Sequence, residues 1–412
     1  MTRALITGIG AITPIGLSGH ETWDNLVAGV SGVGRITAFD PSDLPVHIAA
    51  EIKGFDPGRY IESRAARRMS RFAQISVAAA RLAGEDAGLE LDDSERPRAA
   101  AAIATGAGGV LNTVEQAETL KERGPGRVSP FYVPMMAPNM GACQVAMQLG
   151  LQGPALASVA ACASGLYSFM EARQLIESGT ADVVVAGGSE SCIHPLPIAG
   201  LANMKALSRR NEEPERASRP FDRDREGFVY GEGSVVMVVE SEARARARGA
   251  RVYAELAGGG LSCDAFHITA PLEDGSGAAR AIESALNAAG INADEVDYVS
   301  AHGTGTPLND VSETRAIKAA FGAHSRKLAI SSPKSMVGHL MGAAGALGSL
   351  AAVMAVHSDL VPPTINLETP DPDCDLDYTP LTARETTVRA ATANGFGFGG
   401  QNGCVVFRKF DH

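Results

Sequence analysis

The chain has 412 residues, of which 45% are hydrophobic and 20% are charged, and its formal net charge at pH 7 is −11. This length and composition predict a globular protein of about two domain-sized units. The acidic balance argues against general nucleic-acid binding. The longest apolar run, residues 343–356, is too short and too rich in alanine to predict a membrane span. Six cysteines without paired metal-ligand spacing are typical of reduced thiols in the cytoplasm.

The N-terminal segment predicts a short strand, residues 3–7, that leads into a glycine-rich turn. Gly8-Ile9-Gly10 is similar to part of the dinucleotide-binding fingerprint, but the third glycine is missing from its place. Pro14 also lies where a phosphate-binding helix would begin. These two departures disfavour nicotinamide binding.

Further along the chain, helical and strand-like apolar patterns alternate. The predicted elements here are helices over residues 21–30 and 75–87, a strand over 98–105, a proline-containing loop over 121–141, and a hairpin-like pair of strands over 227–233 and 234–240. Strands that alternate with helices are typical of the α/β class, with mainly parallel sheets covered on both faces.

A thiol, Cys162, lies at the centre of the most informative stretch, residues 154–188. Residues 155–160 predict a buried strand, residues 166–172 a helix, and residues 183–186 a second strand. The thiol is therefore expected to face the unpaired N–H groups of the first helical turn, where the helix dipole favours the thiolate. A lone cysteine is more often a buried structural residue, but the second half of the chain supplies matching histidines.

Two histidines follow predicted strands in the second half. Residues 297–301 predict a strand that delivers His302 into a loop of glycines and threonines. Residues 329–332 predict another strand, followed by a turn that contains His339 and then by a helix. Loops at the carboxyl ends of parallel strands are where such folds bind ligands.

The similar order of elements in the two parts of the chain predicts an internal duplication. The predicted division lies near Arg251. The N-terminal half, residues 1–250, carries Cys162, and the C-terminal half, residues 251–412, carries the two histidines and Lys334.

A cysteine with two histidines is also a candidate metal site. Such a site would need a further protein ligand and close ligand spacing, and neither is evident. Asp310 and Glu313 lie one turn apart on the helix after His302. The sequence favours a role for them in orienting Lys334 and the loop, so no metal is predicted.

Four motifs connect the chain to a known family. They are Ala161-Cys162-Ala163-Ser164-Gly165, His302-Gly303-Thr304-Gly305-Thr306, Lys334-Ser335-Met336-Val337-Gly338-His339 and Gly395-Phe396-Gly397-Phe398-Gly399-Gly400. With these motifs the chain resembles, essentially end to end, the elongating β-ketoacyl-acyl carrier protein synthases of the thiolase superfamily. A Cys-His-His set belongs to the elongating enzymes, since the initiating synthases have asparagine in place of the second histidine. The resemblance implies a dimer with a thiolase-like, five-layered αβαβα fold.

The resemblance also implies a reaction, the decarboxylative Claisen condensation of malonyl and acyl thioesters on acyl carrier protein. Cys162 would attack the acyl thioester and hold the chain as an acyl-enzyme. Backbone N–H groups of Cys162 and Phe398 would form the oxyanion hole. His302 and His339 would bind the malonyl thioester, assist its decarboxylation and stabilise the enolate.

Other positions take their roles from the same resemblance. Lys334, paired with Glu313, would hold the histidines in place, and Phe398 would gate the cavity, whereas Phe396 is expected to be a core aromatic. The residues that would bind substrate or line the acyl pocket are Thr304, Thr306, Thr269, Asn112 and Thr113. No cofactor is expected, because the substrates are carried on the phosphopantetheine arm of the carrier protein.

Basic side chains interrupt the acidic surface. Four arginines between residues 64 and 71 follow helical spacing on one face, and Lys205 forms a second basic group with two nearby arginines. A charge run is usually just a solvated face, but carrier proteins are acidic. The positions that the resemblance assigns to carrier-protein docking are Arg64, Arg67, Arg68, Arg127 and Lys205.

Some departures and alternatives stay open. Gly348 stands where family members often have a glutamate tied to a bound cation, so that ion is not predicted. A ketosynthase subunit of a type II polyketide synthase, working with a chain-length-factor partner, fits the sequence nearly as well. A non-catalytic chain-length factor is disfavoured by the presence of Cys162 and both histidines. A coenzyme A thiolase is disfavoured by the context of Cys404.

Overall fold

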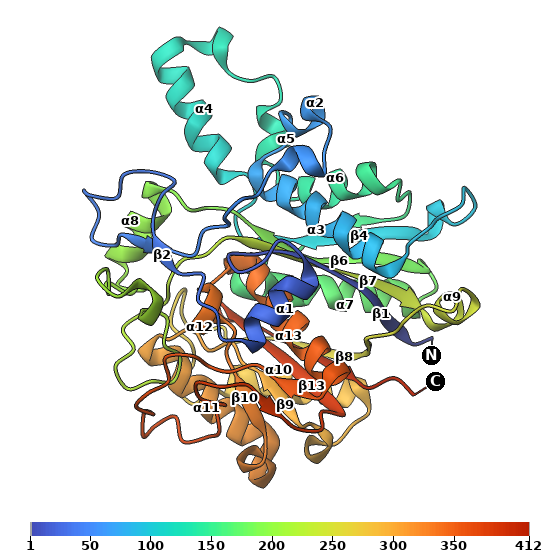
Figure 1. The fold of residues 1–412 in the computed structure, drawn as a ribbon, viewed down its shortest axis with the longest axis vertical. Helices are drawn as coiled ribbons and strands as arrows, with labels where there is room; N and C mark the ends of the chain where they lie inside the picture. The colour runs from blue at the N-terminus through green and yellow to red at the C-terminus, as the bar shows by residue number, and fades with distance from the viewer. Residues whose placement is uncertain (1, 412) are drawn as a thin grey trace.

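The computed structural model describes residues 2–411, and one mixed sheet organises them (Figure 1). Its strands lie in the order β10-β9-β13-β14-β8-β1-β7-β6-β4-β5. They are β1 (Ala4–Ile12), β4 (Ala99–Ala104), β5 (Ala155–Leu156), β6 (Val183–Glu190), β7 (Gly233–Ser241), β8 (Ala254–Cys263), β9 (Tyr298–Ser300), β10 (Ala329–Ser331), β13 (Ala390–Gly397) and β14 (Gln401–Arg408). Two short pairs lie apart from this sheet, β2 (Gly34–Arg35) with β3 (Ile48–Ala49) and β11 (Leu360–Val361) with β12 (Arg384–Glu385).

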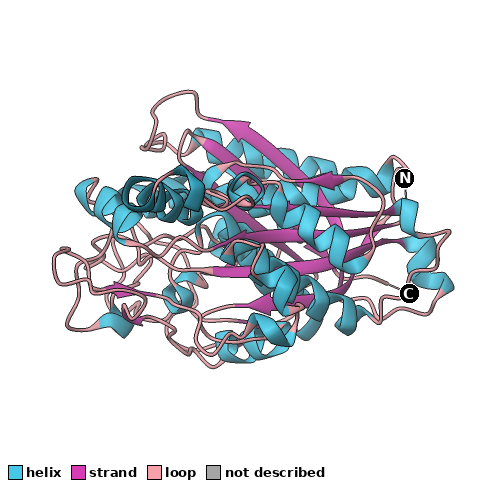
Figure 2. Cartoon of the chain, turned by 90° about the horizontal axis from the view of Figure 1, so that it is seen from above, coloured by secondary structure: helices cyan, strands magenta, loops and turns pink. Residues whose placement is uncertain are grey.

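Helices cover both faces of the sheet (Figure 2). They are α1 (Gly19–Val27), α2 (Ser63–Ala66), α3 (Arg71–Ala87), α4 (Val110–Arg123), α5 (Tyr132–Met136), α6 (Met140–Leu149), α7 (Ser164–Glu177), α8 (Pro195–Asn203), α9 (Glu242–Ala247), α10 (Ser276–Ala289), α11 (Pro307–Phe321), α12 (Lys334–Val337) and α13 (Ala344–Ser358).

The two halves of the sheet have the same strand order. The first strands of the two halves, β1 and β8, lie side by side at the centre of the sheet. From there to the outer edge the order is β1-β7-β6-β4-β5 in the first half and β8-β14-β13-β9-β10 in the second. Neighbours are parallel toward the two edges and antiparallel from β13 through to β6. The prediction of mainly parallel sheets is therefore wrong, because the last strand of each half, β7 or β14, runs against the other four and the two halves meet antiparallel at β1 and β8.

The layers follow from which helices touch which strands. The helices α3 and α6 cover the outer face of the first half, and α10 covers the outer face of the second half with α11 beside it. The helices α7 and α13 lie between the halves, with α7 on β6 and β4 and α13 on β13 and β9. The chain therefore has the predicted thiolase-like αβαβα architecture.

Glycines in the two central strands allow the outer helices to approach closely. A Cβ at Gly8 would lie 2.3 Å from the Ala83 carbonyl oxygen of α3. In the second half, a Cβ at Gly260 of β8 would lie 2.2 Å from the Ala281 carbonyl oxygen of α10. Gly8, which belongs to the motif similar to a dinucleotide fingerprint, thus serves helix packing. Gly260 has the same role in the second half.

The apolar character of α13 reflects its place between the two halves. Residues 341–358 form a helical segment that is long and apolar enough to cross a membrane, but 78% of it is buried inside the protein. The expectation that this run is too short was therefore wrong. Its alanines and leucines instead belong to the central core.

Two local predictions are also wrong. No hairpin forms over residues 227–240, because only β7 is a strand and residues 228–231 make isolated bridges to residues 207, 339 and 50 instead. Residues 121–141, predicted as loop, contain the end of α4 and all of α5. Pro134 is tolerated in α5 because it lies in the first turn, where its missing N–H has no helical acceptor.

The crossing of α7 and α13 depends on side chains of minimal size. A Cβ at Gly165 of α7 would lie 2.5 Å from the Ala346 N atom of α13. In the first turn of α13, a Cβ at Gly345 would lie 2.9 Å from the Leu166 N atom of α7. The two helix N-termini can therefore meet only through glycine.

A Gly165→Ala substitution tests this crossing. Because the added methyl group collides with backbone, we expect the free energy of unfolding to fall by about 1–3 kcal/mol, measured as a lower midpoint of thermal unfolding. Gly200→Ala is the matched control, since Gly200 also lies in a helix but a Cβ there meets nothing within 4 Å. An unchanged midpoint for Gly165→Ala would contradict the close approach.

Candidate active site

Cys162 lies in a strained turn between β5 and α7. It is the middle residue of a 3-10 turn, Ala161–Ala163, that runs directly into α7. Ala161 has a φ angle of +47°, which residues other than glycine rarely adopt. Ser164 stabilises the turn, because its hydroxyl accepts the N–H of Ala160 (2.8 Å) and donates to the carbonyl of Ala161 (2.6 Å).

Burial controls the protonation of the Cys162 thiol. The side chain is buried, and burial raises the pKa of Cys162 to about 11. The charge of Lys334 and the backbone N–H groups of Phe398 and Cys162 itself act in the other direction. The expected stabilisation of the thiolate at the helix start is thus outweighed by burial, and the free thiol is protonated at pH 7.

His302 is held through its backbone by two charged side chains. Glu313 of α11 accepts the N–H groups of His302 and Gly303, both at 2.7 Å. Lys334 donates to the carbonyl oxygen of His302. Lys334 and Glu313 therefore act on the same residue through different backbone groups, and no direct ion pair between them is seen among the described residues. Each charge still favours the ionised form of the other side chain.

Lys334 also carries a shifted pKa of its own. Burial lowers the pKa of Lys334 to about 8, although the nearby Glu313 opposes this shift. At pH 7 its ammonium group therefore remains charged and lies within the electrostatic reach of Cys162.

The ring of His339 is fixed in one tautomer. The backbone N–H of Met341 donates to Nδ1 of His339 at 3.1 Å. An amide nitrogen can only donate, so Nδ1 carries no proton and the neutral ring has its proton on Nε2. The backbone of His339 is fixed as well, because its N–H binds the Val229 carbonyl at 2.7 Å and its carbonyl accepts the N–H of Gly231 at 3.0 Å.

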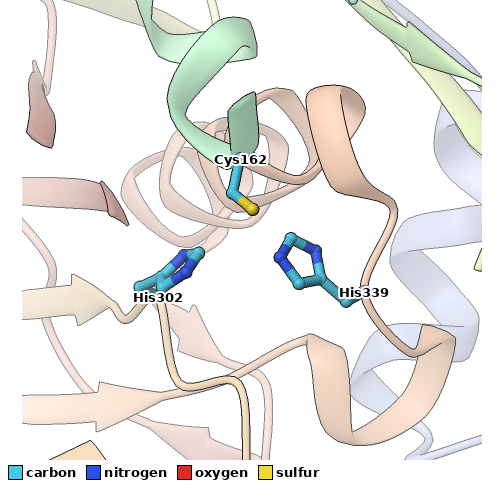
Figure 3. A group of neighbouring side chains, drawn as sticks. All are labelled: Cys162, His302 and His339. Atoms are coloured by element: carbon cyan, nitrogen blue, oxygen red, sulfur yellow. The ribbon is translucent and has the colours of Figure 1, made fainter. Parts of the chain in front are cut away.

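The three side chains converge on one point. The Cys162 sulfur and one ring nitrogen of each histidine lie within 4.8 Å of one another, and Figure 3 shows Cys162 pointing between the two rings. The ring centroids of His302 and His339 are 5.5 Å apart, with the planes at 84°. Burial, reinforced by the charge of Lys334, lowers the pKa of both imidazoles well below the ordinary value, so both rings are neutral at pH 7.

The hydrogen bond at His339 bears on the metal alternative. A metal held by Nε2 of His339 would require the ring proton to move to Nδ1. That nitrogen already accepts the N–H of Met341. Metal binding would also need the deprotonated sulfur, whereas burial keeps Cys162 protonated. The arrangement therefore fits a nucleophile with two hydrogen-bonding imidazoles better than a metal centre.

A cavity of about 330 Å³ opens onto the three side chains. The predicted binding residues Thr269, Thr304 and Thr306 line it, as do Lys205 and Phe398. The hydroxyls of Thr304 and Thr306 bind each other at 2.9 Å. These threonines thus place hydroxyl groups in the cavity that contains the sulfur.

Other predicted positions lie elsewhere or have a different environment. Asn112 and Thr113 lie on α4 and do not line this cavity. The helix α4 has no fully buried residue and extends away from the body of the protein (Figure 1). Phe396, expected in the core, instead lines the cavity and lies edge-on to His302, with ring centroids 5.6 Å apart.

The predicted docking residues Arg64, Arg67, Arg68, Arg127 and Lys205 are all exposed. The prediction of a single basic helical face is wrong, because α2 ends at Ala66 and Arg71 begins a separate helix, α3. Arg71 instead binds Glu232 through two hydrogen bonds of 2.8 and 2.9 Å.

Residues that sequence reasoning missed support the site from behind. Asn394 of β13 donates to Glu313 at 3.3 Å. Arg225 binds the carbonyl of Thr306 at 3.3 Å and forms an ion pair with buried Asp310. The sequence around them gives no signal of these contacts, because the partners are far apart in the chain and meet only in the fold.

Comparisons with known proteins agree along the whole chain. Residues 1–245 match the beta-ketoacyl synthase N-terminal domain family, and residues 253–368 match the C-terminal domain family. The chain is 47% identical over 408 residues to a 3-oxoacyl-[acyl-carrier-protein] synthase 2 of Synechocystis, covering 99% of this chain and 98% of the relative.

Two solved structures are also similar. The ishigamide ketosynthase/chain length factor is 37% identical, with a TM-score of 0.92 and 100% coverage of both chains. A type II polyketide synthase ketosynthase, solved in complex with its acyl carrier protein and bound to a hexaketide, is 32% identical. Its TM-score is also 0.92, with 99% of this chain and 100% of that chain covered.

A Lys334→Met substitution tests the electrostatics of the site. Removing the cation that lowers the pKa of Cys162 leaves less thiolate at a given pH, so we expect alkylation of Cys162 by iodoacetamide at pH 7 to slow by about tenfold. The measurement is peptide mass spectrometry over time. Lys327→Met, which removes an exposed lysine elsewhere, is the control. An equal rate in both variants would show that Lys334 does not act on the sulfur.

Proposed function

The chain belongs to the beta-ketoacyl synthase family, and we propose that it condenses a Cys162-bound acyl chain with malonyl-acyl carrier protein to give 3-oxoacyl-acyl carrier protein. It is an acyltransferase of the 3-oxoacyl-acyl carrier protein synthase type. The observation that carries the proposed residue roles is the convergence of one protonated thiol and two neutral imidazoles in a buried cavity.

In the first half-reaction, the Cys162 sulfur attacks the thioester carbonyl of the acyl-carrier protein. The thiol must lose its proton, and His302 is the acceptor that the geometry favours, because Nε2 of His339 already carries a hydrogen. The N–H groups of Cys162 and Phe398 face the sulfur and would stabilise the oxyanion. The carrier-protein thiolate leaves and takes up the proton, so the imidazole returns to neutral.

In the second half-reaction, a malonyl thioester occupies the same cavity. The Nε2–H of His339 would donate to the thioester oxygen, and neutral His302 would donate a second hydrogen bond. Carbon dioxide leaves, and the enolate that remains attacks the carbonyl carbon of the acyl-cysteine. The carbon–sulfur bond breaks, and the Cys162 thiolate takes up one proton from solvent. Neutral donors suit this step, because they stabilise an anion without quenching it by proton transfer.

The pantetheine arm has a polar path to the sulfur. Thr269, Thr304 and Thr306 all line the cavity that contains His302 and Cys162. Their hydroxyls can donate to the amide carbonyls of the arm or to the malonyl group. No resident cofactor is part of this proposal, because the carrier protein brings both substrates.

Exposed cations support docking of the acidic carrier protein. Arg64, Arg67 and Arg127 are exposed and form no ion pair with another described residue, and Arg68 stacks on Phe131 at 4.7 Å. Lys205 lies at the cavity itself. In a chain with a net charge of −11, such unpaired cations would steer an acidic partner toward the cavity mouth.

A second copy of the chain, or a similar subunit, would cover the exposed apolar surface near the edge strand β5. Large apolar side chains are exposed on the neighbouring elements at Leu120, Val133, Met136, Met147 and Val159. Such a patch is unusual on a monomer. The similar structures leave two assemblies open, a homodimer and a pair with a chain-length factor. We place the protein in the cytoplasm, in fatty-acid synthesis or, alternatively, in type II polyketide synthesis.

The acyl-enzyme is the direct test of the reaction. Incubated with acyl-carrier proteins of several chain lengths, the protein should gain the mass of one acyl group at Cys162, and addition of malonyl-carrier protein should release the 3-oxoacyl product. In a Cys162→Ser variant the rate of 3-oxoacyl product formation should fall by at least about a thousandfold. Measured with and without a chain-length-factor subunit, the product distribution separates the fatty-acid and polyketide alternatives. Condensation by Cys162→Ser at the parental rate would refute the proposal.

Reversal of charge tests the docking surface. Because Arg64 and Arg67 would attract the carrier protein, the double variant Arg64→Glu/Arg67→Glu should lower kcat/KM for acyl-carrier protein by about tenfold at low salt, and less at high salt. The same variant should acylate normally from a small acyl-pantetheine thioester. Lys327→Glu, an exposed cation elsewhere, serves as the control. A loss of activity with both substrates would show that the substitutions disturb the folded structure and not the docking of the carrier protein.

A further inference from the structure

Glu190 is a fully buried carboxylate at the end of β6 that the reaction does not use. It has no cation beside it among the described residues, and every contact is made by a donor. The donors are the N–H of Gly106 (2.7 Å), the hydroxyl of Thr105 (3.1 Å), the N–H of Gly342 (3.1 Å), the N–H of Ala107 (3.3 Å) and the thiol of Cys192 (3.7 Å). Burying an ion is costly unless hydrogen bonds or opposite charges compensate it, and here the five donors provide that compensation.

These bonds join two segments that are far apart in the sequence. One is the loop after β4, which contains Gly106, and the other is the turn that leads into α13, which contains Gly342. The turn is strained, because Met341 has a φ angle of +48°. A carboxylate that binds the N–H of Gly342 therefore fixes the peptide directly after Met341.

Met341 is the residue whose N–H sets the tautomer of His339. On its other side, His339 is bound by the backbone of Val229 and Gly231. Tyr230 lies between those two residues and hydrogen-bonds Cys192, which in turn contacts Glu190. Glu190 thus contacts the turn at Gly342 directly and is linked to residues 229–231 through Cys192 and Tyr230.

The second half contains a similar arrangement at the counterpart loop. There Glu313 binds the N–H groups of His302 and Gly303 after β9, as Glu190 binds those of Gly106 and Ala107 after β4. The strands β4 and β9 occupy equivalent places in their halves. One buried glutamate therefore orders the backbone at each histidine, His302 directly and His339 through Met341.

We propose that Glu190 is a positioning residue for His339: by holding the Met341–Gly342 peptide, it keeps Nδ1 of His339 as an acceptor and Nε2–H directed at the malonyl thioester. This inference rests on the proposed function of His339 in decarboxylation. It predicts a selective effect, because acylation of Cys162 uses the N–H groups of Cys162 and Phe398 and does not use the His339 proton. The charge of Glu190 also raises the pKa of Cys162, so its neutralisation does not hinder formation of the thiolate.

A Glu190→Gln variant separates the two half-reactions. The amide places an NH2 group against backbone donors, so the turn shifts and His339 loses its fixed tautomer. We expect decarboxylation of malonyl-carrier protein without acyl primer, measured as acetyl-carrier protein formed, to slow by about tenfold or more, while acylation of Cys162 changes by less than about threefold. Glu240→Gln is the matched control, since Glu240 is equally buried on the neighbouring strand β7 but bound to Arg244 and Arg248. It should leave both rates unchanged.

The alternative outcomes are distinct. Equal loss of both half-reactions in Glu190→Gln, or decarboxylation at the wild-type rate in the folded variant, would overturn the inference. A wild-type protein that performs neither half-reaction would instead refute the proposed function. Should Glu190→Gln not fold, Glu190→Asp keeps the charge but retracts it, and the same selective loss is expected.

A spectroscopic readout on the wild-type protein does not depend on any variant folding. With 15N-labelled histidine, and with His339→Asn used to assign the signal, His339 should show a protonated Nε2 and an unprotonated Nδ1 between pH 6 and pH 9. A mixture of tautomers, or a proton on Nδ1, would overturn the inference. In folded Glu190→Gln the signal should move toward such a mixture.

Discussion

The constraint on which this structure depends is the burial of a thiol and two imidazoles together, without a charged partner on any of the three reactive atoms. Burial keeps Cys162 protonated and both rings neutral. The nearest charges, Lys334 and Glu313, bind the backbone of His302 and not its ring. The site therefore offers preorganised neutral donors in a buried environment, where each hydrogen bond to a developing anion is stronger than in water.

The duplicated architecture explains how such a site is built. Both halves place a strained 3-10 turn before the central helix, with a φ angle of +47° at Ala161 and +48° at Met341. In one half the next residue is the nucleophile Cys162, and in the other it is Gly342, which leaves room for the loop after β4, because a Cβ there would lie 2.2 Å from the Gly106 N atom. One turn thus presents the sulfur, and its counterpart presents the N–H that orients His339.

The sequence allowed the reactive residues to be predicted, because each stands at a strand-to-helix junction in a short motif. It also allowed the layered fold to be predicted. The antiparallel centre of the sheet could not be predicted, since strand direction depends on pairing between segments such as β1 and β7 that are distant in the chain. Likewise Glu190 has no motif of its own: its role depends on Gly106 and Gly342, which approach it only in the folded protein.

The errors have a common physical origin. Residues 228–231 look like a strand because they are apolar, yet their backbone groups bind three separate segments and help to fix His339. Phe396 looks like a core residue for the same reason, but it lies against His302 at the cavity. In both cases apolar character indicates burial, and burial around a reaction centre cannot be distinguished by composition from burial in the core.

The most direct measurement is a crystal structure of the protein with an acyl group trapped on Cys162. The thioester carbonyl oxygen should accept hydrogen bonds from the N–H groups of Cys162 and Phe398, and both imidazoles should remain free to face the vacant malonyl position. An acyl carbonyl bound to His302 or His339, or a Cys162 that cannot be acylated, would contradict the assignment of the backbone N–H groups to the acyl-enzyme and of the imidazoles to the malonyl thioester.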